Sequence, residues 1–147
     1  MIPSSLRRAE PLLGSLIVAD AMHRGVVTLS PSASLRDVAA TMAEHRIHAI
    51  VIIDEGPPGA DDDRLWGVVS DIDLMRGISS TVSLDAGNLA ALDGFDIGPD
   101  EPLAAAARLM AEHEVSHLVV VQDGRPAGVL STHDIARVAA GGNAHGR

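Results

Sequence analysis

"GVLSTHDIARVA" (residues 128–139) has the same skeleton as an earlier stretch, "GVVSDIDLMRGI" (residues 67–78). In both, a Gly precedes two apolar residues, and a Ser, two variable positions and an Asp follow. An apolar residue, one further residue and an Arg complete the match. The apolar part is typical of a strand, and the Ser-x-x-Asp spacing is typical of a helix start. The sequence therefore predicts the same strand-to-helix corner twice in one chain.

The duplication extends upstream of these corners. The stretch "SPSASLRDVAATMAEHRIHAIVII" (30–53) aligns with "GPDEPLAAAARLMAEHEVSHLVVV" (98–121), and both contain Met-Ala-Glu-His. The first copy has a longer connection between its last two strands, in residues 54–64, whose Gly, Pro and Asp content predicts a surface loop. The second copy makes this connection with Asp123-Gly124, a pair that suits a tight hairpin turn.

Each copy predicts elements in the order β-α-β-β-α. The apolar runs at 49–53 and 117–121 are rich in β-branched residues, as in strands buried on both faces. A unit of about 60 residues buries too little surface to be comfortably stable alone. We therefore expect an α/β (α+β) fold in which two repeats pack sheet to sheet with pseudo-twofold symmetry. The expected parts are an N-terminal extension (1–14), repeat 1 (15–78), a linker (79–88), repeat 2 (89–141) and a flexible tail (142–147).

Composition excludes several classes of function. The net charge is −9 and all eleven cations are Arg, so the chain lacks both the basic surface that nucleic acids require and a lysine for Schiff-base chemistry. There is no Cys, which removes disulfides and thiol catalysis. No apolar run approaches the roughly 20 residues of a membrane span. With no catalytic fingerprint in the sequence, we expect a cytoplasmic protein that is not an enzyme, needs no cofactor and binds neither nucleic acid nor membrane.

The duplicated unit, with Gly-apolar-apolar-Ser-x-x-Asp at its last corner, resembles a tandem pair of cystathionine-β-synthase (CBS) domains, a Bateman module. The resemblance covers residues 15–141. It implies a stand-alone regulatory protein that senses an adenosine-containing ligand (AMP, ADP, ATP or S-adenosylmethionine) in the clefts between repeats. It also implies a homodimer and a protein partner of unknown identity. The sequence leaves open which nucleotide binds, whether one or both clefts are used, and the dimer geometry.

The resemblance assigns site residues by position. The motif Asp is expected to contact the ribose hydroxyls, and the motif Ser the phosphate. The first short strand of each repeat, Val26 to Thr28 and Phe95 to Ile97, is expected to line the adenine. Asp96 is a departure, since it places a carboxylate there. The expected ligand-binding set is Ser131, Asp134, His133, Thr132, His117, Phe95, Ile97, Ser70, Asp73, His48, Val27 and Thr28, with Arg137 and Arg76 as candidate phosphate cations.

The two corners differ in charge. Asp71 adds a second carboxylate to the first corner, where it would repel a phosphate. The second corner has Thr132 and His133 instead, with His117 upstream. We therefore expect the cleft built on Ser131 and Asp134 to be the better site for a phosphorylated ligand.

Two alternatives stay open. Both corners are also capping boxes, like Ser34-x-x-Asp37, to which we assign capping alone. In that case the pair only dimerises and docks a partner. The second alternative is a metal-binding protein, because the pairs His45/His48 and His113/His117 have a spacing that allows chelation if both members share a helix.

Overall fold

The computed structural model describes residues 14–54, 56, 64–90 and 96–141. Phe95, the expected tail, nearly all of the expected N-terminal extension and most of the long loop therefore lie outside the described residues.

The first repeat contains a helix between short and long strands. Its elements are β2 (Thr28–Leu29), α3 (Leu35–His45), β3 (Ala49–Asp54), β4 (Arg64–Ser70) and α4 (Asp71–Ser79). Helix α3 begins because the Ser34 hydroxyl accepts the Asp37 N–H and the Asp37 carboxylate accepts the Ser34 N–H, each at 3.0 Å. These hydrogen bonds to the charged form lower the pKa of Asp37. The helix ends at Arg46, whose φ of 54° lies in the left-handed region.

The second repeat follows the same plan. Its elements are β5 (Asp96–Ile97), α6 (Leu103–His113), β6 (His117–Gln122), β7 (Arg125–Ser131) and α7 (Thr132–Ala139). Helix α6 ends at Glu114 with a φ of 53°, which matches Arg46 of the first repeat. A short helix, α5 (Ala86–Leu89), lies between the repeats at the end of the expected linker. It packs its Ala86 and Leu89 into the core of the first repeat.

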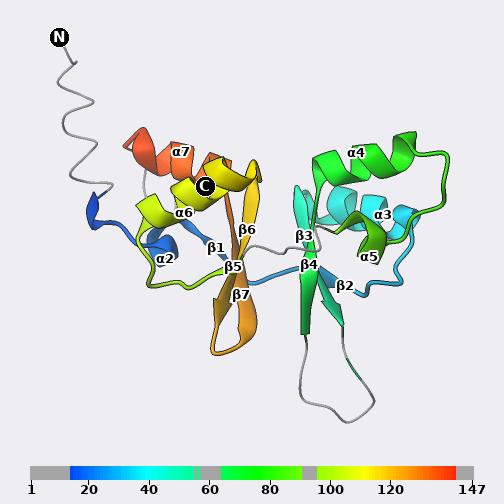
Figure 1. Cartoon of the computed structure of the whole chain (residues 1–147), viewed down its shortest axis with the longest axis horizontal. Coiled ribbons are helices and arrows are strands. Elements are labelled where there is room, and N and C mark those ends of the chain that lie inside the picture. The colour runs from blue at the N-terminus through cyan, green and yellow to red at the C-terminus, as the bar shows by residue number, and fades with distance from the viewer. Residues whose placement is uncertain (1–13, 55, 57–63, 91–95, 142–147) are drawn as a thin grey trace.

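The strands form two sheets, one of order β2-β3-β4 and one of order β1-β7-β6-β5. In the second sheet β1 (His23–Arg24) pairs antiparallel with β7, with His23 opposite Val129. The segment α2 (Val18–Ala21) to β1 thus comes before the first repeat in sequence but belongs to the second half in space, as Figure 1 shows. The repeat boundaries in the sequence are therefore not the boundaries of the packed halves.

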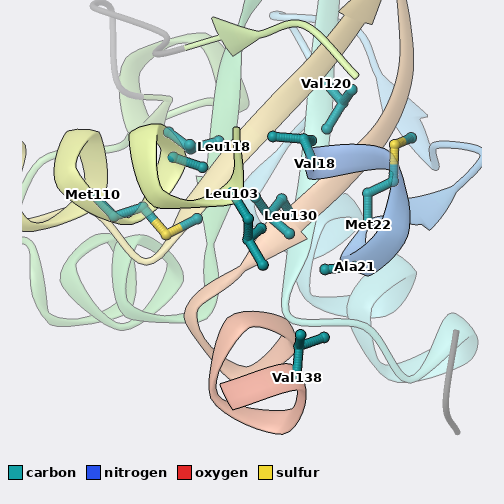
Figure 2. Close-up of a cluster of buried hydrophobic side chains, with 10 residues drawn as sticks. Val18, Ala21, Met22, Leu103, Met110, Leu118, Val120, Leu130 and Val138 are labelled. Carbon is teal, nitrogen blue, oxygen red and sulfur yellow. The ribbon is translucent and has the colours of Figure 1, made fainter. Parts of the chain in front are cut away.

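The core of the second half depends on this exchanged segment. Val18, Ala21 and Met22 are buried against Leu103 and Leu130. Figure 2 shows these side chains meeting between α2, α6 and α7. The first half has its own core around Ile50 and Ile52 on β3. Each half thus buries one face of its sheet under helices.

The opposite sheet faces meet each other. Between the two sheets lies a third cluster of apolar residues, in which Val51 of β3 and Val119 of β6 are fully buried. Ile50 and Ile52 point to the helices while Val51 points to the other sheet, which explains why the strand sequence is apolar at every position. The expected fold of two repeats packed sheet to sheet is confirmed.

Candidate functional site

A cleft of about 930 Å³ lies between the two repeats. Its size falls within the range of about 300–1,000 Å³ that is usual for small-molecule sites. Both repeats contribute to it: the segment around β1, the junction of α3 and β3, and the corner where β7 turns into α7. The lining residues are His23, Arg24, Gly25, Val26, Val27, Arg46, Ile47, His48, Ala49, Asp71, Ser116, His117, Val129, Ser131, Thr132, His133 and Asp134.

Asp134 is the buried charge of this cleft, with a side chain that is 1% exposed. Its Oδ2 accepts the backbone N–H of Ser131 at 2.9 Å. Its Oδ1 lies 2.8 Å from Nε2 of His23 and accepts a hydrogen bond from Nη2 of Arg137 at 2.9 Å. A carboxylate this deeply buried requires charged partners, and the guanidinium one turn along α7 supplies one.

The first corner is built in the same way but is more open. Asp73 Oδ2 accepts the N–H of Ser70 at 2.9 Å, and Asp73 Oδ1 accepts a weaker bond from Arg76 at 3.3 Å. The Asp73 side chain is 18% exposed. Neither Ser70 nor Asp73 lines the cleft described above. The positions equivalent to His23–Val27 in the second repeat are 91–95, which fall outside the described residues.

Helix capping is present at both corners. The Ser131 hydroxyl accepts the Asp134 N–H at 3.1 Å, and the corresponding distance at the first corner, from Asp73 N to Ser70 Oγ, is 3.4 Å. The first helical N–H groups are also engaged, since Thr132 donates to the carbonyl of Ser116 at 3.0 Å. The backbone at the start of α7 is therefore partly satisfied from within. Side chains, rather than free backbone N–H groups, are therefore the main polar groups that this corner offers to a ligand.

Basic side chains also line the cleft. Arg24 follows His23 on β1, and Arg46 occupies the left-handed turn after α3. Both are exposed. His133 and Thr132 lie at the start of α7, as expected. The cleft thus combines one buried carboxylate with several cationic or titratable groups at its rim, an arrangement that fits a ligand with both hydroxyls and phosphate.

The lining of the cleft contains a second, exposed histidine–carboxylate pair. Nδ1 of His48 lies 3.4 Å from Oδ2 of Asp71. Asp71 had been assigned to a separate first cleft, but it lines the same cleft as Asp134 because α4 begins beside the start of β3. Across from it, the half-buried His117 has a pKa lowered from 6.5, chiefly by burial. His48 also lowers that pKa, whereas Asp71 raises it.

We expect this histidine to make the fold sensitive to acid. The unfolded chain, with the ordinary histidine pKa of 6.5, binds the His117 proton before the folded protein does, so acidification below that value favours unfolding. The urea midpoint, followed by the fluorescence of Trp66, should fall more between about pH 7.5 and about pH 5.5 in the wild type than in His117→Gln. Equal slopes in the two proteins would contradict this explanation.

The structure brings together only part of the set that the sequence predicted. Ser131, Thr132, His133, Asp134, His117, His48 and Val27 line the cleft, with Val26 beside them. Thr28 does not, because it pairs with Val51 in β3, and Ile97 packs against the core of the second half. Asp96 is exposed on β5 and does not line this cleft either. Arg76 and Arg137 pair with the motif carboxylates rather than extending into the cleft.

Three basic lining residues were missed by sequence reasoning, namely His23, Arg24 and Arg46. Nothing in the local pattern of residues 23–24 shows that this segment crosses to the other repeat. Arg46 had a weak signal, because it directly follows the duplicated Met-Ala-Glu-His and so marks the helix end.

The metal-binding alternative gains no geometric support. Among the residues that the structure describes, no cluster of three or more His, Cys, Asp or Glu side chains is arranged to hold a metal ion. His45 and His113 are in the last turns of their helices, whereas His48 and His117 lie in the cleft. The two members of each pair are thus not on one helix face. In the described ranges, no helix is both long and apolar enough to cross a bilayer.

The family assignment follows from a direct match. The CBS domain family matches residues 18–80 and 97–141, which are the two repeats. This chain belongs to the CBS domain family. It is a CBS pair, and the resemblance inferred from the duplicated corner is confirmed.

Curated relatives of similar sequence differ in length. Hypoxic response protein 1 of Mycobacterium tuberculosis is 30% identical over 122 residues, which cover 80% of this chain and 81% of that protein. Homoserine O-acetyltransferase of Methanohalophilus mahii is 33% identical over 125 residues, but these are 84% of this chain and 24% of the enzyme. The chain therefore spans about a quarter of that enzyme's length.

One solved structure is similar in both sequence and fold. The CBS domain protein PAE2072 from Pyrobaculum aerophilum, complexed with AMP, is 30% identical with a TM-score of 0.70. The match covers 81% of this CBS pair and 89% of that chain.

Proposed function

We propose that this CBS pair is a non-catalytic regulatory module that binds an adenosine-containing ligand in the cleft between its repeats. The observation that carries the proposal is the buried Asp134 in a cleft that the exposed Arg24 and Arg46 also line. A carboxylate can accept both ribose hydroxyls, and guanidinium groups suit phosphate. The similarity to a CBS protein complexed with AMP supports the same ligand class.

Among the candidate ligands, the charges favour AMP. Arg24 and Arg46 favour a phosphorylated ligand over free adenosine. The net charge of −9 opposes the approach of a polyphosphate more than that of a monophosphate. We therefore rank AMP ahead of ADP and ATP, with S-adenosylmethionine as the alternative that carries no phosphate. For such a role we propose a cytoplasmic location, which cell fractionation would test. We also propose a protein partner, which cross-linking would identify.

Calorimetric titration tests this function directly. Wild-type protein should bind AMP more tightly than adenosine, and Arg46→Ala should reduce that preference roughly tenfold, because one charge-assisted contact to phosphate is lost. ADP, ATP and S-adenosylmethionine complete the series. An absence of binding by the wild type to millimolar concentrations of all of these ligands would overturn the proposal.

A second candidate function is homodimerisation and docking of a partner without nucleotide. Helix α4 exposes Ile72, Met75 and Ile78 on one side, and Val82 follows them. The equivalent positions on α7 are His133, Ala136 and Ala139, which are polar or small. Because, of these two helices, only α4 has such an apolar face in the part of the chain that the structure describes, we favour a dimer in which α4 packs against α4 of a second copy.

We expect Met75→Glu to convert that dimer into a monomer, because two buried carboxylates would meet across a twofold interface. Ala136→Glu, at the equivalent position on α7, is the matched control and should leave the dimer intact. Sedimentation velocity over a range of concentrations distinguishes these outcomes. A wild-type protein that sediments as a monomer at every concentration would rule the dimer out.

A further inference from the structure

We propose that His23 competes with the ribose of the ligand for Asp134, and so sets the affinity of the cleft for ribonucleosides. The inference rests on the proposed function, and it concerns a residue outside the duplicated motif. His23 lies on β1, the strand that crosses from the start of the first repeat to the sheet of the second. Its Nε2 is 2.8 Å from Asp134 Oδ1, the shortest of the contacts to that carboxylate.

The hydrogen-bonding capacity of Asp134 explains why the two compete. Of its two oxygens, Oδ2 accepts the N–H of Ser131, and Oδ1 meets both His23 and Arg137. The carboxylate is 1% exposed, so a ribose hydroxyl cannot reach it unless one of these partners moves. Ser131 contributes a backbone group of the capping box, which is fixed by the helix.

Of the two side chains on Oδ1, His23 is the one free to move aside. Its side chain is 64% exposed, whereas that of Arg137 is 19% exposed. Arg137 also lies one turn along the same helix as Asp134, where it neutralises the carboxylate without crossing the cleft. Displacement of His23 towards solvent would therefore open Oδ1 on the cleft side, with the ion pair to Arg137 kept.

The first repeat provides an internal comparison. Its motif carboxylate, Asp73, is bonded to Ser70 and Arg76 but is 18% exposed. The sequence position equivalent to His23 is 91, which is an alanine and has no imidazole to offer. The more buried of the two motif carboxylates, Asp134, is thus the one whose repeat partner position holds a histidine.

Competition by an imidazole depends on its charge. A protonated His23 would hold Asp134 more strongly, so the affinity for a ribonucleoside should fall in acid. Other charged or titratable groups also line the cleft, from β1, the α3–β3 junction, α4, β6 and α7. They are Arg24, Arg46, His48, Asp71, His117 and His133, and Arg137 adds its charge through Asp134. These groups are present in every His23 variant, so the difference between variants isolates His23.

The test uses adenosine, which has the ribose diol but no phosphate, and 2′,3′-dideoxyadenosine, which has neither. At about pH 8, His23→Ala should bind adenosine roughly fivefold more tightly than the wild type, and the gap should widen at about pH 6. Dideoxyadenosine should bind the two proteins equally, since it makes no demand on Asp134. His23→Gln, which retains a neutral donor, should lie between them, and its gap to His23→Ala should not change with pH.

A second measurement needs no ligand. Urea unfolding of wild type, His23→Ala, Asp134→Asn and the double variant gives the coupling between the two side chains, which should be larger at about pH 6 than at about pH 8. Absence of coupling overturns the inference whatever binds. Coupling together with adenosine affinity that is unchanged or weaker in His23→Ala also overturns it, because His23 would then be a ligand contact or a spectator. If neither protein binds adenosine, the inference is overturned, whereas the proposed function fails only if AMP, ADP, ATP and S-adenosylmethionine do not bind either.

Discussion

Asp134→Ala should reduce the affinity for AMP roughly 100-fold and should also lower the free energy of unfolding by about 3 kcal/mol. The first effect follows because the carboxylate is the proposed acceptor for the ribose hydroxyls. The second follows because Arg137, which is 19% exposed, would lose its buried partner, and α7 would lose half of its capping box. Calorimetric titration of AMP and urea unfolding measure the two effects separately.

Asp134→Asn separates binding from folding. The amide keeps the shape of the side chain and can still accept the Ser131 N–H, but it loses the charge. We expect a smaller loss of stability and a roughly tenfold loss of AMP affinity. The matched control is Asp37→Asn, which makes the same change in a capping box of identical spacing that lies outside the cleft. Wild-type AMP affinity in a folded Asp134→Asn would move the ribose contact elsewhere.

The fold was largely predictable because the chain repeats it. Two copies of one pattern fix the order of elements twice, and the shortness and β-branched content of an apolar run such as 49–53 favour a strand with both faces buried. Even the left-handed helix ends at Arg46 and Glu114 fall at equivalent positions. Local chemistry determines the strands and the helix starts, so the sequence alone was sufficient to predict them, whereas Arg46 and Glu114 lack the glycine or asparagine that marks a left-handed helix end.

The exchange of β1 was not predictable from the same signals. The segment from Val18 to Arg24 is too short to show a period, and its choice of sheet is decided by packing against residues far away in sequence. The site inherits this limit. Asp134 could be named from the motif, but His23 reaches it only because β1 pairs with β7.

The charge of the cleft was misjudged for a related reason. Asp71 was assigned to a site of its own, since in sequence it belongs to the first corner. In space it lies beside His48 on the wall of the cleft that contains Asp134. A repeat alignment shows which residues are equivalent but not which residues lie close together in space. The lining of a cleft between repeats depends on this spatial proximity.

Gly128→Val should destabilise the protein by about 3 kcal/mol, at the upper end of the cost of overpacking, and should abolish AMP binding with it. A Cβ at this position would collide with the carbonyl oxygen of His23 and with the terminal methyl group of Met22. Because the first obstacle is backbone, the strain can be relieved only if β1 moves away from β7. The buried side chains of α2 would then leave the core, and His23 to Val27 would leave the cleft.

The Gly that both matching stretches share therefore has a structural role in the second copy, where the missing side chain of Gly128 allows β1 to approach β7 closely. Gly98→Ala is the matched control, because the nearest atom to its new Cβ, Cγ of Glu101, is 3.7 Å away, an ordinary contact. Urea unfolding followed by circular dichroism should separate the two variants clearly, with Gly128→Ala between them. If Gly128→Val unfolds at the wild-type midpoint, β1 does not pair with β7 in solution, and a cleft that depends on His23 cannot be correct.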